Sequence, residues 1–537
     1  MASATLLPAV YLVVRAADTG LDSVLDTVTA GRTLDLLART ALLAVTVTAT
    51  SVALAVPLAW LTVRTDLPWR RVWVVLGALP LAIPSYVGGF AFVAAIGPRG
   101  LVQGWLAPLG VEELPSIYGF PGAWLVLTLF SYPYVLLTVR AAVRRLDPSL
   151  EEASRILGRG RRATFWRVIL PQLRPSIAAG GLLVALYTMS DFGAVSLLRF
   201  DSFTRAIYVQ YRASLDRSTA ATLGLVLITL MVVVLAAETR SRGRAEYHRL
   251  HGGGARTPPV VPLGRWRWPA AAACAALVAV ALVVPLGVIG YWLVRGISAG
   301  EPLRLTGTLI GHSLVASALG AGMAVVAAWP VAVLAARHPG RLSRVVERAS
   351  YTGYALPGVV VALALVFFGA RVAEPIYQTR TLLVFAYVVL FLPQAVGAIR
   401  ASLLQVNPSL EEASRLLGRS KAATTWSVVL PLVRPGALAG VALVFLTCMK
   451  ELPATLLLAP TGYDTLATQV WNATSEAFFG RAAAPALALV LLSALPMAVL
   501  VMREVDRPDA PYPAATKDGD GADISSGLSQ AVVGPPT

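Results

Sequence analysis

The sequence predicts an all-α polytopic membrane protein with two tandem lobes of six spans each. The chain has 537 residues, of which 56% are hydrophobic and only 14% charged, whereas a soluble domain carries about a quarter charged residues. Apolar runs of about twenty residues recur throughout, and each is long enough to cross a bilayer as a helix. The third observation is an internal duplication, and because each copy holds an even number of spans, we expect the lobes to be related by a pseudo-two-fold axis along the membrane normal.

The duplication is clearest in two polar stretches between apolar runs. Residues 147–159 read DPSLEEASRILGR and residues 407–419 read NPSLEEASRLLGR, at a spacing of 260. Further upstream the halves align at a spacing of 273, which pairs Arg64 with Arg337. A spacing held over this distance indicates a repeated architecture.

The apolar runs predict the spans in chain order. Those of the first half are 4–15, 34–63, 72–96, 121–143, 173–198 and 220–237, and those of the second half are 268–294, 307–336, 349–370, 381–399, 433–458 and 482–502. The first run is short beside its counterpart 268–294, so the first helix is either genuinely short or truncated at its start. A cleaved signal peptide is the alternative, but no basic region precedes the run.

Composition shifts predict four segments. Residues 1–239 form the first transmembrane lobe and residues 268–503 the second. Between them, 240–267 is rich in Arg, Gly and Pro, which predicts a flexible, basic cytoplasmic linker. The last stretch, 504–537, is rich in Pro, Gly, Asp and Ser, which predicts a disordered tail.

The net charge of +16 first suggests a nucleic-acid partner. Its distribution argues otherwise, because Arg residues cluster in short loops separated by even numbers of spans, as the positive-inside rule requires. We therefore expect a multi-pass protein of the plasma membrane with both termini in the cytoplasm and no bound nucleic acid. Cys274 and Cys448 both fall in apolar runs, so neither a disulfide framework nor a Cys or His metal site is predicted.

The repeated stretch predicts a short capped helix outside the membrane. Asp147 can cap its start with Pro148 at the first helical position, and Gly158 can end it in a left-handed conformation. A second helical stretch, 163–169, is expected to end at Pro171.

Two interpretations of this helix are open. Its arginines could hold it on anionic lipid headgroups. A shaped protein partner is favoured, since lipid binding would tolerate more sequence drift than the two near-identical copies show.

The residues of this stretch resemble a known family. Glu152-Ala153-Ser154-x-x-x-Gly158, then nine residues and Val168-x-Leu170-Pro171, is similar to the EAA loop of ABC importer permeases with a MetI-like core. The copy at 412–431 matches equally, and both carry Ser where the family has a second Ala. The resemblance is strongest to fused twelve-span permeases for ferric iron or thiamine.

The resemblance implies a coupling helix that docks into an ATP-binding subunit, once per half. The residues expected to carry this coupling are Glu151, Glu152, Ala153, Gly158, Glu411, Glu412, Ala413 and Gly418. The partners it implies are two copies of an ABC ATP-binding subunit, an extracytoplasmic substrate-binding protein and the lipid bilayer. The chain has no G-x-x-x-x-G-K-[ST] motif, so we expect it to bind no cofactor, ATP being used by the partner subunit.

Two equivalent stretches, 190–200 and 450–460, bear on the substrate and look more like ferric iron permeases than thiamine permeases. They place Asp191 and Glu451 in apolar surroundings, where an ionisable group is a functional candidate. Ferric iron prefers oxygen ligands, so these carboxylates could flank its path. The alternative is that Lys450 pairs with Asp191 or Glu451 and holds the halves together. Which residues would ligate a metal is left unassigned.

These observations predict the membrane permease of an ATP-driven importer, most simply one for ferric iron. Thiamine or another small solute is the alternative cargo, and a secondary transporter is a less favoured mechanism. A membrane enzyme would need a cluster of polar catalytic residues within the spans, and beyond Asp191 and Glu451 the sequence offers none.

Overall fold

The computed structural model describes residues 2–18, 20–98, 100–111, 113–213, 217–241, 260–338 and 340–505. This part of the chain is built from helices, with one isolated parallel β-bridge between Thr65 and Val261. Most of the predicted linker, 242–259, and most of the predicted tail, 506–537, lie outside the described residues.

The helices of the first half lie before, within and after the repeated stretch 147–159. They are α1 (Ala2–Ala17), α2 (Leu21–Thr29), α3 (Gly31–Arg64), α4 (Arg70–Ala78), α5 (Ser85–Ile96), α6 (Leu101–Leu106), α7 (Phe120–Arg144), α8 (Pro148–Ile156), α9 (Arg161–Thr164), α10 (Leu170–Ser190), α11 (Gly193–Leu197), α12 (Phe203–Ala213) and α13 (Arg217–Ser241).

The helices of the second half follow the same order, but among the described residues no α-helix corresponds to α2 or α6. They are α14 (Arg267–Val278), α15 (Val284–Ser298), α16 (Gly307–Arg337), α17 (Arg341–Tyr351), α18 (Gly358–Arg371), α19 (Arg380–Leu403), α20 (Pro408–Leu416), α21 (Lys421–Thr424), α22 (Leu430–Lys450), α23 (Pro453–Leu458), α24 (Leu466–Ser475) and α25 (Phe479–Val505).

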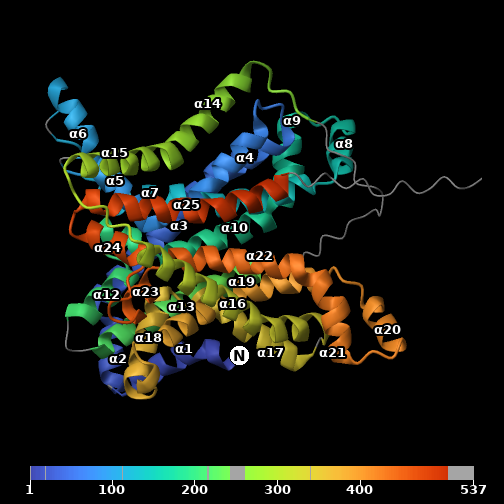
Figure 1. The fold of residues 1–537 in the computed structure, drawn as a ribbon. Helices are drawn as coiled ribbons and strands as arrows, with labels where there is room; N and C mark the ends of the chain where they lie inside the picture. The colour runs from blue at the N-terminus through green and yellow to red at the C-terminus, as the bar shows by residue number, and fades with distance from the viewer. Residues whose placement is uncertain are drawn as a thin grey trace, which may run out of the picture.

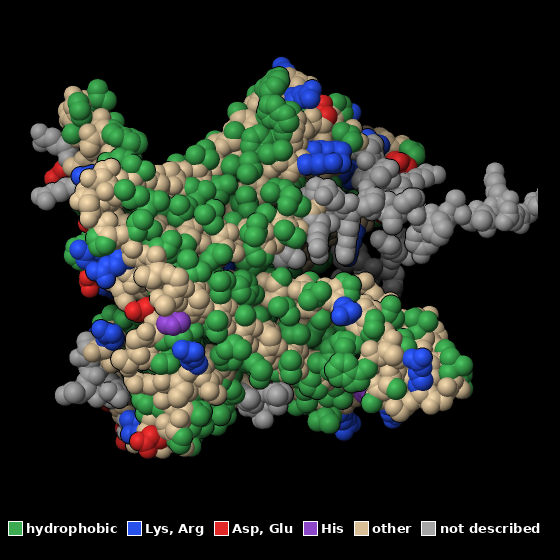
Figure 2. Space-filling model, in the orientation of Figure 1, with side chains coloured by type: hydrophobic (Ala, Val, Ile, Leu, Met, Phe, Trp, Pro, Cys, Tyr) green, Lys and Arg blue, Asp and Glu red, His purple; other side chains and the backbone are tan. Residues whose placement is uncertain are grey.

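Among the described residues, 10 helical segments are long and apolar enough to cross a membrane. The apolar helices Thr5–Ala17 and Gly358–Arg371 are shorter. Figure 2 shows hydrophobic side chains over the middle of one face, with charged side chains gathered towards its two ends. This distribution is the one expected of a protein whose helices run across a bilayer.

Four predicted spans are interrupted rather than continuous. The run 72–96 breaks before Pro84, and its counterpart 349–370 breaks before Pro357. The runs 173–198 and 433–458 break at Asp191 and Glu451, where the backbone becomes extended. Proline disfavours a helical conformation of the residue before it, which explains the first pair.

The prediction that the stretch 163–169 ends at Pro171 is wrong. The chain stays helical from Arg161 to Ser190 because a π-helical turn, Phe165–Ile169, joins α9 to α10. The second half repeats this with the turn Thr425–Val429. A π turn shifts the hydrogen-bond pattern by one residue, which accommodates a proline that cannot donate a backbone bond.

The helices pack into two groups that do not coincide with the halves of the sequence (Figure 1). In one group, α3, α4, α5, α7 and α10 are covered by α14, α15 and α25 of the second half. In the other, α16 to α22 are covered by α1 and α13 of the first half. The outer helices of each half, α1 and α13 in the first and α14, α15 and α25 in the second, therefore pack on the other half.

Candidate coupling and transport sites

The two repeated stretches fold into matching helices, α8 and α20, at the same end of the molecule, one on each helix group (Figure 1). Asp147 caps α8 by accepting a hydrogen bond from the Ser149 amide at 2.9 Å, and Asn407 caps α20 from the Ser409 amide at 3.1 Å. A proline follows each cap, as predicted. Both helices thus begin at a fixed position.

Each of the two helices is fastened by a carboxylate and an arginine. Glu151 is buried and pairs with Arg64 at the end of α3 and with Arg155 at 2.6 Å. In the second half, Glu411 pairs with Arg337 at the end of α16, at 2.8 Å. Arg64 is itself almost fully buried, and breaking a buried pair leaves an uncompensated charge. These pairs tie each surface helix to a long membrane helix.

A second contact fixes the turn that follows each helix. The Ser154 hydroxyl lies 3.1 Å from that of Thr164, and Ser414 lies 3.0 Å from Thr424. An alanine could not make this bond, which gives a physical reason for the serine in the EAA-like pattern.

The two terminating glycines are as predicted, since Gly158 has φ +77° and Gly418 has φ +83°. This left-handed conformation favours glycine, and it ends α8 before α9 and α20 before α21.

Large apolar side chains are exposed at the ends of these helices. Ile156 and Leu157 are 85% and 77% exposed, and Leu416 and Leu417 are 89% and 82% exposed. Large apolar groups this exposed mark an interaction surface. Sequence reasoning did not single them out, although their position just before the terminating glycines was visible.

The predicted coupling residues fall into two sets. Glu152, Ala153, Glu412 and Ala413 are exposed on the same helices, while Glu151 and Glu411 point into the protein. The exposed residues can contact a partner, whereas the inward glutamates can only hold the helix in place. Sequence reasoning missed their arginine partners, although Arg64 and Arg337 align in the repeat.

Asp191 occupies the break between α10 and α11. Its carboxylate accepts a hydrogen bond from the Ser85 hydroxyl and bonds from the amides of Ala194 at 3.0 Å and Val195 at 3.3 Å. The side chain is buried, with 7% of its surface exposed. It therefore caps the start of α11 and joins it to the start of α5.

Glu451 occupies the equivalent break between α22 and α23. Its Oε1 accepts a bond from the Ala454 amide at 3.3 Å. A Cβ on Gly358, at the start of α18, would lie only 2.3 Å from this oxygen. Gly358 aligns with Ser85 at the spacing of 273, so the longer carboxylate occupies the space that a serine side chain fills in the first half.

The alternative in which Lys450 pairs with Asp191 or Glu451 is wrong. Its Nζ donates a hydrogen bond to the carbonyl of Leu81 at 2.7 Å, and the described residues give it no ion pair. Leu81 lies in the short 3₁₀ turn Leu79–Ala82 of the first half. Lys450 does therefore connect the two halves, but through a backbone oxygen.

One further polar group lies near the start of α5. The Tyr86 hydroxyl is buried and has no hydrogen-bond partner among the described residues. Gly193, two residues after Asp191, packs so closely on Tyr86 that an added Cβ would lie 2.6 Å from the Tyr86 Cβ. In the part of the chain that the structure describes, no three His, Cys, Asp or Glu side chains gather as metal ligands would.

Comparison with known families matches residues 42–244 and 328–503 to one model, that of the binding-protein-dependent transport system inner membrane component. The chain belongs to this family. The two matched ranges, one in each half, confirm the predicted MetI-like resemblance and the tandem arrangement.

Individual relatives agree with the family. The chain is 35% identical over 501 residues to the Fe(3+)-transport system permease protein FbpB 2 of Haemophilus influenzae, covering 92% of this chain and 95% of the relative. It is 25% identical over 444 residues to the ferric transport system permease protein FbpB of Actinobacillus pleuropneumoniae, covering 78% of this chain and 64% of the relative. A sulfate transport system permease protein, CysT of Escherichia coli, is 32% identical over 138 residues, or 26% of this chain.

Membership of the family establishes the general role of the chain. It is a multi-pass inner-membrane permease of an ABC transport system, and such systems include an ATP-binding subunit and a substrate-binding protein. The relatives are transport components rather than enzymes, as the sequence predicts for this chain.

Proposed function

We propose that the chain is the permease of an ATP-driven importer of ferric iron. The observation that carries this proposal is the similarity to an Fe(3+)-transport permease over 92% of the chain, together with two anchored surface helices at one end of the bundle. Two copies of an ATP-binding subunit would each receive one of these helices, α8 or α20. ATP would be used by those subunits, and the permease itself would bind no cofactor.

The route from the coupling helix to the membrane interior is continuous in each half. Ser154 holds α8 against Thr164, and the chain then stays helical from Arg161 through the π turn to Asp191. A pull on α8 would therefore be transmitted along α10 to the break where Asp191 holds α5 and α11 together. The pair of Glu151 with Arg64 would transmit the same pull to α3.

Alternating access would follow from this linkage. Closure of the two ATP-binding subunits would draw α8 and α20 together and open the path on the outer side, and hydrolysis would reset it. Asp191 and Glu451 occupy equivalent breaks in the two helix groups and supply the oxygen atoms that ferric iron prefers. In this proposal the hydrogen bond from Lys450 to the Leu81 carbonyl links the two sides of the path.

The orientation belongs to the same proposal. The helices α8 and α20 carry arginines and would face the cytoplasm, so the loops at the opposite end, before α12 and α24, would receive the substrate-binding protein. With this orientation both termini lie in the cytoplasm.

Uptake of labelled ferric iron in cells with and without the gene tests the proposal. Labelled thiamine and labelled sulfate serve as parallel arms. Loss of iron uptake alone supports the proposal. Loss of thiamine or sulfate uptake with iron uptake intact would refute the cargo and leave the coupling mechanism in place.

A further inference from the structure

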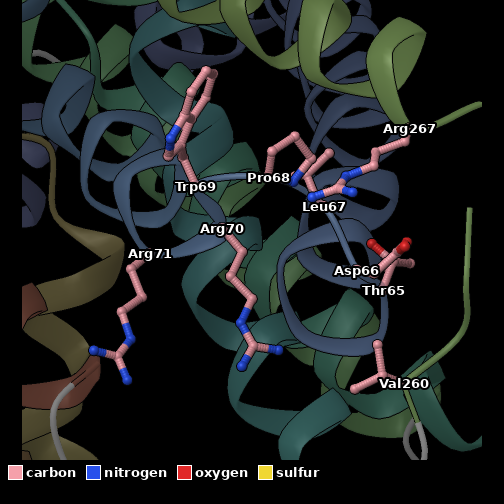
Figure 3. Close-up of a pocket in the computed structure, with 9 residues that line it drawn as sticks. All are labelled: Thr65, Asp66, Leu67, Pro68, Trp69, Arg70, Arg71, Val260 and Arg267. Atoms are coloured by element: carbon pink, nitrogen blue, oxygen red, sulfur yellow. The ribbon is translucent and has the colours of Figure 1, made fainter.

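A cleft of about 520 Å³ opens beside the anchor of α8, between the end of α3 and the start of α14 (Figure 3). The residues that line it come from two short stretches of the chain, 65–71 and 260–267. They are Thr65, Asp66, Leu67, Pro68, Trp69, Arg70, Arg71, Val260 and Arg267. A volume of this size suits a small ligand or a headgroup. None of the coupling residues lines it.

Hydrogen bonds that involve the backbone hold the walls of this cleft. The Val261 amide donates to the Arg64 carbonyl at 2.7 Å, and the Leu263 amide donates to the Asp66 carboxylate at 2.8 Å. The Trp73 indole donates to the Pro68 carbonyl at 2.8 Å. The segment that leads into the second half is thus fixed against the loop that follows α3, so the cleft has a defined shape.

The charge of the cleft is positive. Arg70 and Arg71 extend in the same direction from the start of α4, and Arg267 reaches towards Leu67 and Pro68 from α14 (Figure 3). Within the described residues none of these three arginines forms an ion pair, and the one carboxylate of the cleft, Asp66, already accepts the Leu263 amide. The cleft thus holds three guanidinium groups and one carboxylate, which is already hydrogen-bonded. This excess of positive charge favours an anionic ligand.

Exposed tryptophans lie in, or directly next to, the same two stretches of the chain as the residues that line the cleft. Trp69 and Trp268 are 65% and 66% exposed, with their ring centroids 6.5 Å apart, and Trp266 is 62% exposed. Tryptophan collects at the boundary between lipid and water, and α3 ends and α14 begins beside the cleft. The cleft therefore lies at the depth of lipid headgroups, which points to a lipid phosphate rather than a dissolved one.

The second half repeats this arrangement only in part, because Arg71 corresponds to Arg344 at the spacing of 273. At the spacing of 273, Trp69 corresponds to Leu342 and Arg70 to Ser343, and Ser343 turns back to donate to the Leu334 carbonyl at 3.1 Å. The nearest cleft there is lined by Glu347 as well as arginines, and Glu347 pairs with Arg400 at 3.0 Å. The excess of arginine over carboxylate is thus larger in the cleft of the first half.

We propose that this cleft binds the phosphate headgroup of an anionic phospholipid from the cytoplasmic leaflet. The loop that would hold the lipid continues directly into Arg64, which anchors α8 through Glu151. Lipid in the cleft would stabilise the anchor of one coupling helix and not the other. The permease would then respond to anionic lipid through its first half.

Lipid retention by the purified full-length chain tests this proposal. The chain is equilibrated with vesicles of phosphatidylcholine and phosphatidylglycerol, extracted into detergent, and its bound lipids are counted by native mass spectrometry. The wild type is expected to retain phosphatidylglycerol selectively, and the double variant R70Q/R71Q to lose that selectivity by on the order of thirtyfold. The matched control, R341Q/R344Q, removes the same charge from α17 and should retain the selectivity.

Two results would overturn the proposal. One is equal retention of phosphatidylglycerol by R70Q/R71Q and the wild type. The other is displacement of the lipid by inorganic phosphate or ATP, which would assign the cleft to soluble phosphates. Size-exclusion chromatography checks that each variant is folded, and R267Q, which leaves α4 intact, replaces the double variant if that one does not fold.

Discussion

The two helix breaks hold their carboxylates with different neighbouring residues. Substitutions can convert the arrangement of the second half into that of the first. The first half uses a short carboxylate with a serine, Asp191 with Ser85, and the second half uses a longer one with a glycine, Glu451 with Gly358. Replacing Gly358 by Ser places a Cβ 2.3 Å from the Glu451 Oε1, a separation that Cβ atoms do not tolerate. The carboxylate must move and give up its bond to the Ala454 amide.

The cost of this movement can be worked out from the contacts. Overpacking a tight site costs about 1–3 kcal/mol, and losing a buried bond to a charged group costs about as much. Because the atom that the new Cβ meets is the end of a flexible side chain, part of this strain relaxes, and we expect Gly358→Ser to destabilise the protein by about 2 kcal/mol. We expect Glu451→Asp alone to destabilise it by about 1–2 kcal/mol through the space it leaves. The double variant recreates the arrangement of the first half, so it should recover about 2 kcal/mol relative to the sum of the single variants.

The two single variants and the double variant are compared by thermal unfolding of the purified permease in detergent. Iron uptake is the second measurement. Gly193→Ser is the matched control, because its Cβ would meet Tyr86 instead of Glu451. It should be destabilising, and Glu451→Asp should not rescue it. Additive effects of Gly358→Ser and Glu451→Asp would refute the proposed exchange.

Three further predictions concern coupling and the path. Replacing Gly158 and Gly418 by Val forces a branched residue into left-handed backbone at about 1–2 kcal/mol each, and should leave ATPase activity while lowering uptake; unchanged uptake would contradict the role of these turns. Glu151→Gln leaves Arg64 buried without its counter-charge and should cost about 3–5 kcal/mol, seen as a lower unfolding midpoint. Asp191→Ala and Glu451→Ala should impair iron uptake in assembled transporter, and normal uptake in both would reduce them to helix caps.

The repeat made much of the fold predictable. The recurring apolar runs and the duplication predicted two six-span lobes, and the polar stretches predicted α8 and α20 with their caps and terminating glycines. These features depend on residues within a few positions of one another, so a single sequence contains them. The assignment of residues 1–239 and 268–503 to two transmembrane lobes stays a prediction.

The features that sequence reasoning missed all depend on distant contacts. Arg64 and Glu151 are 87 positions apart, and the residues next to either one do not indicate that the two will pair. The interrupted spans escaped because their residues are apolar on both sides of the break, although Pro84 and Pro357 lay inside the runs. Sequence reasoning did not pair Ser85 with Gly358, because these residues align at a spacing of 273 whereas Asp191 and Glu451 align at a spacing of 260.

The exchange of outer helices between the halves constrains how the lobes can move. Leu12 of α1 packs near Gly224 of α13, and both lie against Val360 of α18, so a displacement of α18 carries both ends of the first half with it. In the other group α15 and α25 lie on α5, which begins at the break held by Asp191. In the proposed transport cycle the moving bodies would therefore be the two packed helix groups and not the two halves of the chain. A rotation of one group must pull on the connections to the other, and this physical link makes it difficult for one coupling helix to move while its partner stays in place.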